Sequence, residues 1–330
     1  MQDFEFDELD LRILHALQVR PRAAWTALAP VVGADPVTVA RRWENLREQG
    51  LCWVAAYRGA TTERVGAFLE IECAPSSVRS VAQQLAEDPE VLTIDLTAGG
   101  RDMLVTLFCR DDADLARYLL DRIPTVEGIQ RLRTHRSIQL VVDAQVWRLR
   151  SLTTTEVRAL EHAVPVARAA VRQVPPEIEH GMLALLREDG RASVASMSAA
   201  LGISIPRTRS ALTTLVAQQR VILRLEVARP YSGWPVYAWY FLQTPASRVS
   251  EVAGNLRGLE EVRLITTTAG QYSLVMAVWL RRMEDITRLE RHIAERLPFA
   301  EIADRSVVLR TPRHLGINLE PSGRRTMPSS

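Results

Sequence analysis

The chain has 330 residues, of which 47% are hydrophobic and 24% are charged, and its formal net charge is +2. This length is sufficient for two or more domains, each with its own core. No run approaches the roughly 18 consecutive apolar residues of a membrane-spanning helix, and the acidic start MQDFEFDELD lacks the blocks of a signal peptide. We therefore expect a cytoplasmic location. The small net charge leaves open whether the partner is a polyanion.

Cysteine and histidine give little support to metal binding or catalysis. Cys52, Cys73 and Cys109 are far apart and form no CxxC pair, so we expect small core residues rather than disulfides or a zinc site. The histidines have no HExxH spacing, and no phosphate-binding or dinucleotide-binding loop occurs. The sequence therefore predicts no cofactor, no metal and no enzyme.

One helical segment occurs twice, because residues 9–51 align without a gap with residues 178–220. The alignment keeps a turn glycine and an Arg-Ala dipeptide in register, which chance similarity between helices rarely does. We interpret it as an internal duplication. The matching residues are Leu14, Leu17, Arg22, Ala23, Gly33, Leu46 and Gln49 in the first copy and Leu183, Leu186, Arg191, Ala192, Gly202, Leu215 and Gln218 in the second.

The first copy divides into three helices. Apolar residues between positions 9 and 17 recur at the spacing of a buried helix face. A short second helix is expected to end at Gly33, and Pro30 within it should shorten or kink it. Asp35 is expected to cap a third helix that ends at Gly50. This order of helix, tight turn and helix is the layout of a helix-turn-helix.

Each copy is followed by segments that alternate with the period of strands and helices. In the first half GAFLEIEC, VLTIDLT, MLVTLFC and SIQLVVD predict strands, with an amphipathic helix after the first and another after the third. The second half repeats the order with VYAWYFL, VRLITTT, SLVMAVWL and SVVLR. The predicted class is therefore α+β, with two repeats, each a winged-helix-like helix-turn-helix followed by a ferredoxin-like βαββαβ domain.

The predicted domain boundaries follow from these segments. The linker has a plausible helix cap at residues 153–155, and the end of the chain lacks apolar anchors. We expect a helix-turn-helix at 1–59, a ferredoxin-like domain at 60–143, a partly helical linker at 144–175, a second helix-turn-helix at 176–230, a second ferredoxin-like domain at 231–311 and a disordered tail at 312–330.

The segment LDLRILHALQVRPRAAWTALAPVVGADPVTVARRWENLREQGL resembles the helix-turn-helix of the Lrp/AsnC (feast/famine) transcriptional regulators, and TAGGRDMLV is similar to their GxxDxxL element. Most members carry one copy and dimerise through the ferredoxin-like part, so this chain resembles a fused pair. The resemblance implies a regulator that binds double-stranded DNA, senses an amino acid or related metabolite and forms homo-oligomers.

The expected DNA-binding residues lie in the third helix of each copy. The first turns of a recognition helix enter the major groove, where arginine can bind guanine or phosphate. In the second copy Ser210 and Ala211 replace the first copy's arginine pair, so an asymmetric operator is expected, and this copy could instead be a packing module. The candidates are Thr38, Arg41, Arg42 and Asn45 in the first copy and Arg207 and Arg209 in the second.

The resemblance places effector binding between paired ferredoxin-like domains, near the glycine-containing loop. Because Ser273 replaces the aspartate in the second copy, the two sites should not bind one ligand equally. The alternative is a plain turn between strands. The candidates are Thr97, Gly99, Arg101 and Asp102 in the first copy and Thr268, Gly270, Tyr272 and Ser273 in the second.

Two other functions remain open. Siroheme decarboxylases resemble the same architecture and occur as fused pairs, but their HxYxR-like pattern in the second-strand region has no histidine counterpart in VLTIDLTAGGRD or VRLITTTAGQYS. The other alternative is a regulator-derived interaction module that has lost DNA binding.

Overall fold

The computed structural model describes residues 4–59, 64–166 and 168–327, and its chain divides into two compact units. The helical unit is formed by residues from 1–62, 148–231 and 324–330, and the barrel unit by residues from 63–147 and 232–323. Helix-turn-helix segments from both halves thus share one unit, and the strand-rich segments share the other. This grouping differs from the expected succession of separate domains, because equivalent segments pair with each other.

The first head of the helical unit consists of α1 (Glu8–Val19), α2 (Trp25–Val32), α3 (Pro36–Glu48) and the strand β1 (Cys52–Arg58). Asp7 caps α1 in a capping box, and the Asp35 carboxylate accepts hydrogen bonds from the first turn of α3. Gly33 ends α2 in the left-handed conformation with φ 77°. α2 has 8 residues, as expected of a short helix, but the equivalent helix of the second half, Val194–Leu201, has the same length without a proline, so Pro30 does not shorten α2.

The second head has the same order of elements: α7 (Pro176–Glu188), α8 (Val194–Leu201), α9 (Ile205–Ala217) and the strand β6 (Val221–Val227). Ser204 caps α9, and Gly202 ends α8 with φ 62°. Its core contains Met182, Leu183, Leu186 and Leu215, all buried. The short helix η4 (Arg229–Tyr231) follows β6.

The linker between the halves adds one helix, α6 (Thr154–Ala163), which begins at a capping box formed by Thr153 and Glu156. α6 contacts α1 and α2 of the first head. Two buried side chains of α1 hold the approach to this helix: Gln18 accepts the Leu149 N–H at 2.8 Å, and His15 Nδ1 accepts the Leu152 N–H at 2.8 Å. The positions 169 residues after His15 and Gln18 are Ala184 and Arg187, so the second head lacks this pair.

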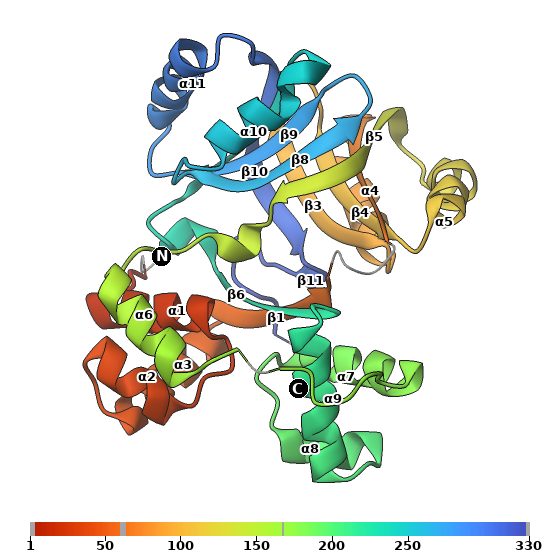
Figure 1. Ribbon diagram of the computed structural model, residues 1–330. Helices are drawn as coiled ribbons and strands as arrows, with labels where there is room; N and C mark the ends of the chain where they lie inside the picture. Colours follow the sequence, from red (N-terminus) through yellow and green to blue (C-terminus); the bar gives the residue numbers. More distant parts are fainter. Residues whose placement is uncertain (1–3, 60–63, 167, 328–330) are drawn as a thin grey trace. The chain divides into compact units, whose positions relative to one another are not determined.

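The barrel unit repeats the order strand, helix, strand, strand, helix, strand. Helices α4 and α5 lie on one side of the barrel and α10 and α11 on the other (Figure 1). The first run comprises β2 (Val65–Cys73), α4 (Val78–Ala86), β3 (Val91–Ala98), β4 (Met103–Cys109), α5 (Asp112–Arg117) with the turns η1 (Tyr118–Arg122) and η2 (Ile123–Thr125), β5 (Ile129–Val142) and η3 (Ala144–Val146). The second comprises β7 (Val236–Gln243), η5 (Ala246–Arg248), α10 (Val249–Leu256), β8 (Val262–Ala269), β9 (Leu274–Leu280), α11 (Asp285–Arg296), β10 (Glu301–His314) and β11 (Ile317–Asn318).

The eight long strands form one closed barrel, in which the two expected ferredoxin-like βαββαβ segments share a single sheet. Their order is β10-β3-β4-β2-β5-β8-β9-β7, and β7 pairs with β10 to close the ring. Strands β5 and β8 join the halves at one seam, and β3 and β10 join them at the other. Each four-stranded sheet alone would leave two edges with unpaired backbone groups, and the two seams satisfy these edges. Apolar cores lie between the strands and the helices of each half.

Residues 312–327 form regular contacts rather than the expected disordered tail. β10 extends to His314, and β11 pairs with it in the barrel unit. In the helical unit the Arg325 N–H donates to the Gly50 carbonyl at 2.8 Å. Backbone pairing and arginine contacts replace the apolar anchors that the tail lacks. Among the residues that the structure describes, no helix has the length and apolar character needed to cross a membrane.

Candidate functional site

The candidate DNA-binding residues of the first head differ in exposure and in the contacts that their side chains already make. Arg41 and Asn45 are exposed on α3, and the Asn45 side-chain oxygen accepts a hydrogen bond from Gln49 at 2.9 Å. Thr38 lies in the first turn, where its N–H donates to Asp35 at 2.9 Å. Arg41 thus presents a cation at the surface of this helix.

Arg42, by contrast, is bound within its own head. Its guanidinium forms an ion pair with Asp7, the cap of α1, and a second with Asp10 at 3.1 Å. The Arg42 side chain is 35% exposed. Any polyanion that binds Arg42 must therefore compete with two carboxylates, so Arg41 and Arg42 are not equivalent.

The second head places its cations nearer the start of its helix. Arg207 and Arg209 are exposed in the first turns of α9. Ala211, at the position equivalent to Arg42, is only 4% exposed and belongs to the core of this head. The two helices therefore share one scaffold but display their arginines at different positions.

The two heads are joined by an exchange of arginines. Arg22 donates to the carbonyls of Gly190 and Ala192, each at 2.6 Å. Arg191, 169 positions later, donates to the carbonyls of Pro21 and Ala23 at 2.6 and 2.8 Å. Burial lowers the pKa of Arg191 to about 10, and the nearby charge of Arg22 acts in the same direction. Each arginine thus holds the loop that carries the other.

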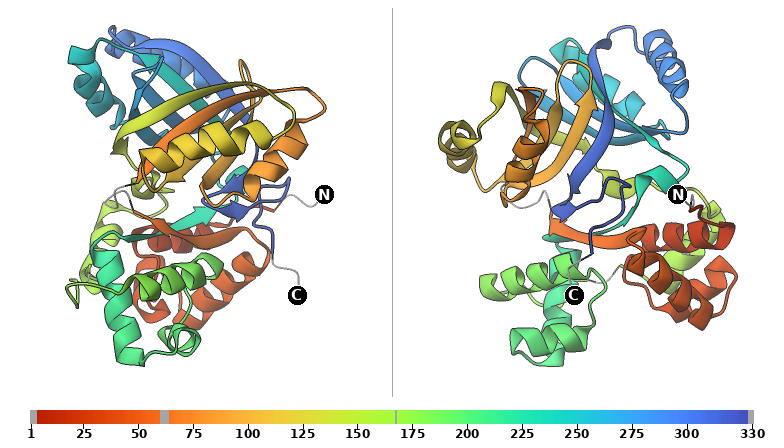
Figure 2. Two further views of the ribbon diagram at one scale, coloured as in Figure 1. Left: turned by 90° about the vertical axis from the view of Figure 1, so that its right-hand side faces the viewer. Right: turned by 180° about the vertical axis from the view of Figure 1, so that it is seen from behind.

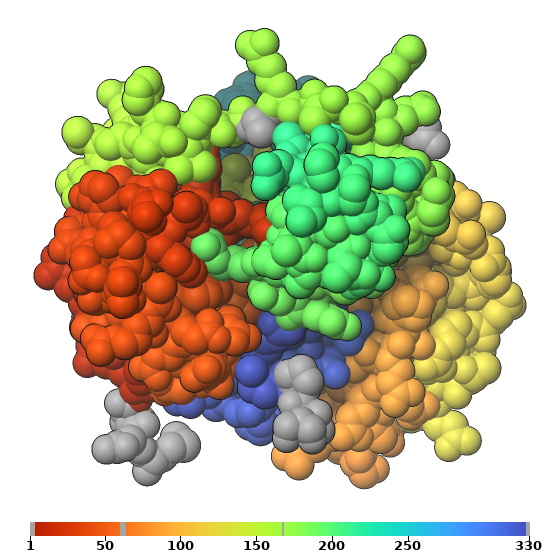
Figure 3. Space-filling model, turned by 90° about the horizontal axis from the view of Figure 1, so that it is seen from below, coloured from red at the N-terminus to blue at the C-terminus, as the bar shows by residue number. Residues whose placement is uncertain are grey.

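Strands β1 and β6 make a second joint between the heads. They pair antiparallel over their full length, with Ala55 opposite Arg224, its own equivalent in the second half. This ribbon runs between the helices of the two heads (Figure 2). In the space-filling view the heads form two distinct lobes, red to orange and green (Figure 3). Pairing and arginine exchange together fix the spacing of α3 and α9.

The expected effector residues form two matching turns in the barrel unit, which join β3 to β4 and β8 to β9. The Thr97 hydroxyl donates to the Arg101 carbonyl at 2.9 Å, and the Thr268 hydroxyl donates to the Tyr272 carbonyl at 2.8 Å. Each turn contains a glycine with positive φ, 130° at Gly99 and 158° at Gly270. The two turns share this geometry, so both hydroxyls are already hydrogen-bonded within their own turns.

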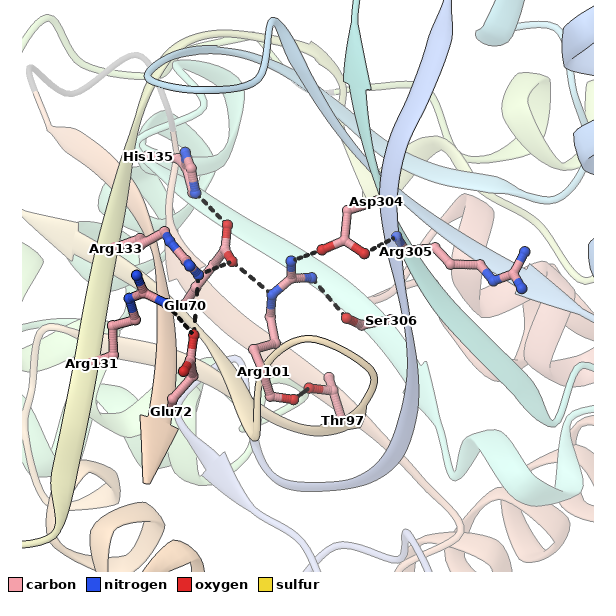
Figure 4. Close-up of polar contacts among 10 residues, drawn as sticks. All are labelled: Glu70, Glu72, Thr97, Arg101, Arg131, Arg133, His135, Asp304, Arg305 and Ser306. Carbon is pink, nitrogen blue, oxygen red and sulfur yellow. Dashed lines mark hydrogen bonds and ion pairs between the residues drawn. The ribbon is translucent and has the colours of Figure 1, made fainter. Parts of the chain in front are cut away.

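Arg101 points into the barrel and binds residues of both halves (Figure 4). Its Nε donates to Glu70 at 2.9 Å, its Nη1 donates to Ser306 at 2.7 Å, and it also pairs with Asp304. His135 Nε2 lies 2.5 Å from the second oxygen of Glu70. Burial opposes ionisation of Glu70, but the hydrogen bond with His135 and the charge of Arg101 leave the pKa of this carboxyl below its usual range. The cluster is thus a buried polar core, in which the Nδ1 of His135 has no hydrogen-bond partner among the described residues.

The second turn occupies an aromatic environment instead. Tyr272 packs against His135 and Phe241, with ring centroids 5.1 and 5.0 Å away. The residues 171 positions after Glu70, Arg101 and His135 are Phe241, Tyr272 and Ser306. The equivalent positions of the two halves thus meet in one cluster but carry different chemistry.

The outer side of the second turn opens on a surface cavity of about 730 Å³. Ser273, one of the expected effector residues, lines it beside Gln271 and Glu301, and Leu297 and Phe299 supply apolar surface. The Thr244 hydroxyl nearby is buried and has no hydrogen-bond partner in the described part of the chain. In the first turn, Asp102 instead accepts the Cys73 N–H at 2.7 Å. Of the expected effector residues, Ser273 is the one that lines this cavity.

Several residues of these sites were missed from the sequence. Glu70 and His135 lie on the neighbouring strands β2 and β5, whose alternation predicts only inward and outward faces. The contact of Asp304 on β10 with Arg101 requires in addition that the barrel closes. Arg22 and Arg191 align with each other in the sequence, and that alignment is a signal for their reciprocal role. The pairing of Arg42 with Asp7 had a weaker signal, the acidic start of the chain.

Comparisons with known proteins match the first half of the chain. A model of the AsnC-type helix-turn-helix domain matches residues 6–47, and a model of the Lrp/AsnC ligand binding domain matches residues 66–147. An uncharacterized HTH-type transcriptional regulator of Pyrococcus furiosus is 28% identical over 137 residues, 39% of this chain and 88% of the relative. The regulatory protein AsnC of Escherichia coli (strain K12) is 28% identical over 138 residues, 41% of this chain and 91% of the relative.

A solved structure matches nearly the whole chain. The siroheme decarboxylase NirDL superposes with a TM-score of 0.60 over 94% of this chain and 93% of its own, at 14% sequence identity. Its complex with an iron-uroporphyrin III analogue superposes with a TM-score of 0.59. At this level of identity the likeness concerns the fold alone.

Proposed function

We propose that this chain, which belongs to the Lrp/AsnC family of transcriptional regulators through residues 6–47 and 66–147, is a DNA-binding transcriptional regulator of the cytoplasm. The observation that carries the proposal is the reciprocal contact of Arg22 and Arg191 between the two heads. Together with the β1–β6 ribbon it holds two candidate recognition helices at one spacing within a single chain. A protein that reads two adjacent half-sites needs such a fixed spacing.

The DNA site is expected to be asymmetric. The first head would contact DNA with Thr38, Arg41 and Asn45, and with Arg42 when it leaves Asp7. The second head would use Arg207 and Arg209, which lie nearer the start of α9. Because the arginines occupy different positions, the half-sites should differ in sequence as well as in orientation.

The effector is proposed to bind in the cavity beside the second turn. Ser273, Gln271 and Glu301 offer hydrogen-bonding groups beside the apolar Leu297 and Phe299, a combination suited to a small polar metabolite such as an amino acid. Because the turn packs against His135 of the other half, a ligand that prefers one arrangement of the barrel seam would shift the equilibrium between arrangements. The first turn has diverged and is proposed not to bind the same ligand.

The test is to incubate the purified chain with fragmented genomic DNA from its source at low and near-physiological salt and to sequence the retained fragments. Enrichment of a few asymmetric sites is expected. The variant Arg207→Ala with Arg209→Ala should reduce the salt slope of binding by roughly one to two. Arg291→Ala, on the exposed face of α11, is the matched control. Retention without sequence preference would refute a sequence-specific regulator and leave the interaction module.

An enzyme acting on a tetrapyrrole is the second candidate, favoured by the histidine and arginines that gather in the barrel. Addition of iron-uroporphyrin III to the protein would distinguish it. A saturable shift of the porphyrin absorption band that His135→Ala abolishes would support this candidate. An unshifted band, together with specific DNA retention, would support the regulator.

A further inference from the structure

A second cavity, of about 490 Å³, lies elsewhere on the barrel unit. Residues of α4, β3, β10 and β11 line it, so both halves of the barrel contribute. Its volume falls in the range of about 300–1,000 Å³ that is usual for small-molecule sites. The residues that line it are Arg79, Ala82, Gln83, Ala86, Glu87, Leu96, Arg310, Pro312, Asn318 and Leu319.

Arg310, one of these residues, lies at an irregular point of β10. The β3–β10 ladder is irregular on both sides of it, between Val308 and Arg310 and between Arg310 and Arg313. Such bulges re-aim a side chain and often lie beside binding sites. The Nε of Arg310 is buried and has no hydrogen-bond partner among the described residues. A buried polar atom without a hydrogen-bond partner is costly, so a binding partner for this Nε is expected.

The charges of α4 are reversed relative to what stabilises a helix. Arg79 lies in the first turn, and Glu87 is the C-cap, whereas the helix dipole favours acids at the start and bases at the end. Both side chains are exposed. Neither side chain forms an ion pair or a hydrogen bond with the residues that the structure describes. Helix stability therefore does not account for these two charges.

The connectivity separates a cationic end of the cavity from an acidic end. Glu87 begins the short loop to β3, whereas Arg79 lies about 12 Å away along the helix, at 1.5 Å per residue. Arg310 pairs with Leu96, near the end of β3, which is the end close to Arg79. Two unpaired cations thus lie at one end of the cavity and one carboxylate at the other.

We propose that this cavity binds an extended amphoteric molecule, with a carboxylate at one end and a cationic amine at the other. Arg79 and Arg310 receive the carboxylate, Glu87 receives the amine, and Leu96, Pro312 and Leu319 contact the apolar chain between them. The site is separate from the cavity beside Ser273, and its test does not depend on DNA binding.

The test uses 6-aminohexanoate as the probe in calorimetric titration of the full chain. Hexanoate lacks the amine, hexylamine lacks the carboxylate, and 3-aminopropanoate has both but is short. We expect 6-aminohexanoate to bind at least about tenfold more tightly than each analogue, since every analogue forfeits one charged contact or its reach. Equal binding of all four, or no binding of 6-aminohexanoate, would overturn the proposal.

Three variants test which residues bind the amine and which bind the carboxylate of the ligand. Glu87→Gln should bring 6-aminohexanoate down to the affinity of hexanoate, and Arg79→Gln should bring it down to that of hexylamine. Both side chains are exposed, so both variants should fold. Arg310→Gln should abolish binding, whereas Arg291→Gln on α11 should leave it unchanged. If Arg79→Gln and Glu87→Gln both retain full affinity, the ligand binds elsewhere. Specific DNA retention by the same variants would show that the regulator proposal survives such a failure.

Discussion

The two halves of this chain are joined by symmetric contacts in the helical unit and by asymmetric contacts in the barrel unit. In the helical unit Arg22 and Arg191 exchange the same contacts residue for residue. In the barrel unit the equivalent positions differ: Arg101 in the first half corresponds to Tyr272, and Glu70 corresponds to Phe241. The symmetric joint needs both arginines to position two heads. The asymmetric joint needs only one polar cluster, so equivalent positions of the two halves can carry different residues.

This difference indicates where each unit can tolerate change. A reciprocal contact loses its counterpart when either arginine is replaced, so the two arginines are expected to matter to a similar degree. A cluster such as Glu70, Arg101 and His135 concentrates the polar chemistry on one side, and the aromatic Phe241 and Tyr272 fill the other. We therefore expect equivalent substitutions to have unequal effects in the barrel and nearly equal effects in the heads.

The largest effect is expected from Arg101→Leu. It leaves Glu70 buried beside Asp304 without their shared cation, and removal of one partner of a buried ion pair costs about 3–5 kcal/mol. Tyr272→Leu, at the equivalent position, removes packing alone and should cost about 1–2 kcal/mol. Urea unfolding followed by circular dichroism measures both. Equal losses would mean that the barrel joint is energetically symmetric despite its sequence.

A pH effect of comparable size is expected from His15, which joins the first head to α6 and has no counterpart in the second. Burial, with a smaller contribution from Arg148, lowers the pKa of His15 to about 4. The unfolded chain therefore binds this proton first, so stability is full above pH 6.5 and falls as the pH approaches 4. The loss is roughly 3 kcal/mol.

Urea unfolding across this pH range, with His15→Asn as the variant, checks the prediction. Asparagine can still accept the Leu152 N–H but does not titrate, so it should flatten this part of the profile. His162→Asn, on the exposed face of α6, is the control and should leave the profile intact. An unchanged slope in His15→Asn would assign the acid sensitivity to other groups.

The sequence was sufficient for local structure because capping and periodicity act over a few residues. Gly33 and Asp35 bound α2 and α3 in the structure as their types predict. The same reasoning missed barrel closure, because pairing of β3 with β10 joins segments more than 200 residues apart and depends on backbone edges rather than side chains. For the same reason it could not place Glu70 and Asp304 on one guanidinium.

The head joint should respond nearly equally to Arg22→Ala and Arg191→Ala. Each leaves two carbonyls without their donor, at a cost of about 1–3 kcal/mol. Arg191→Ala should be the more damaging by about 0.5–1 kcal/mol, because Arg191 also stacks on Trp25 at 3.9 Å. Thermal unfolding of the single variants measures this. A much larger difference would show that one arginine carries the joint and that the reciprocity is only geometric.

The smallest effect is expected at the DNA-binding surface of the first head. Asp7→Asn keeps an N-cap for α1 but removes one of the carboxylates that hold Arg42. If Arg42 contacts phosphate in the complex, its release should tighten DNA binding roughly threefold and steepen the salt dependence. Glu8→Gln removes the same charge from the same helix without touching Arg42, so it measures the long-range contribution alone. Equal gains in affinity in both variants would mean that Arg42 stays paired with α1 and that Arg41 is the first head's phosphate contact. A larger gain in Asp7→Asn would mean that Asp7 competes with DNA for Arg42.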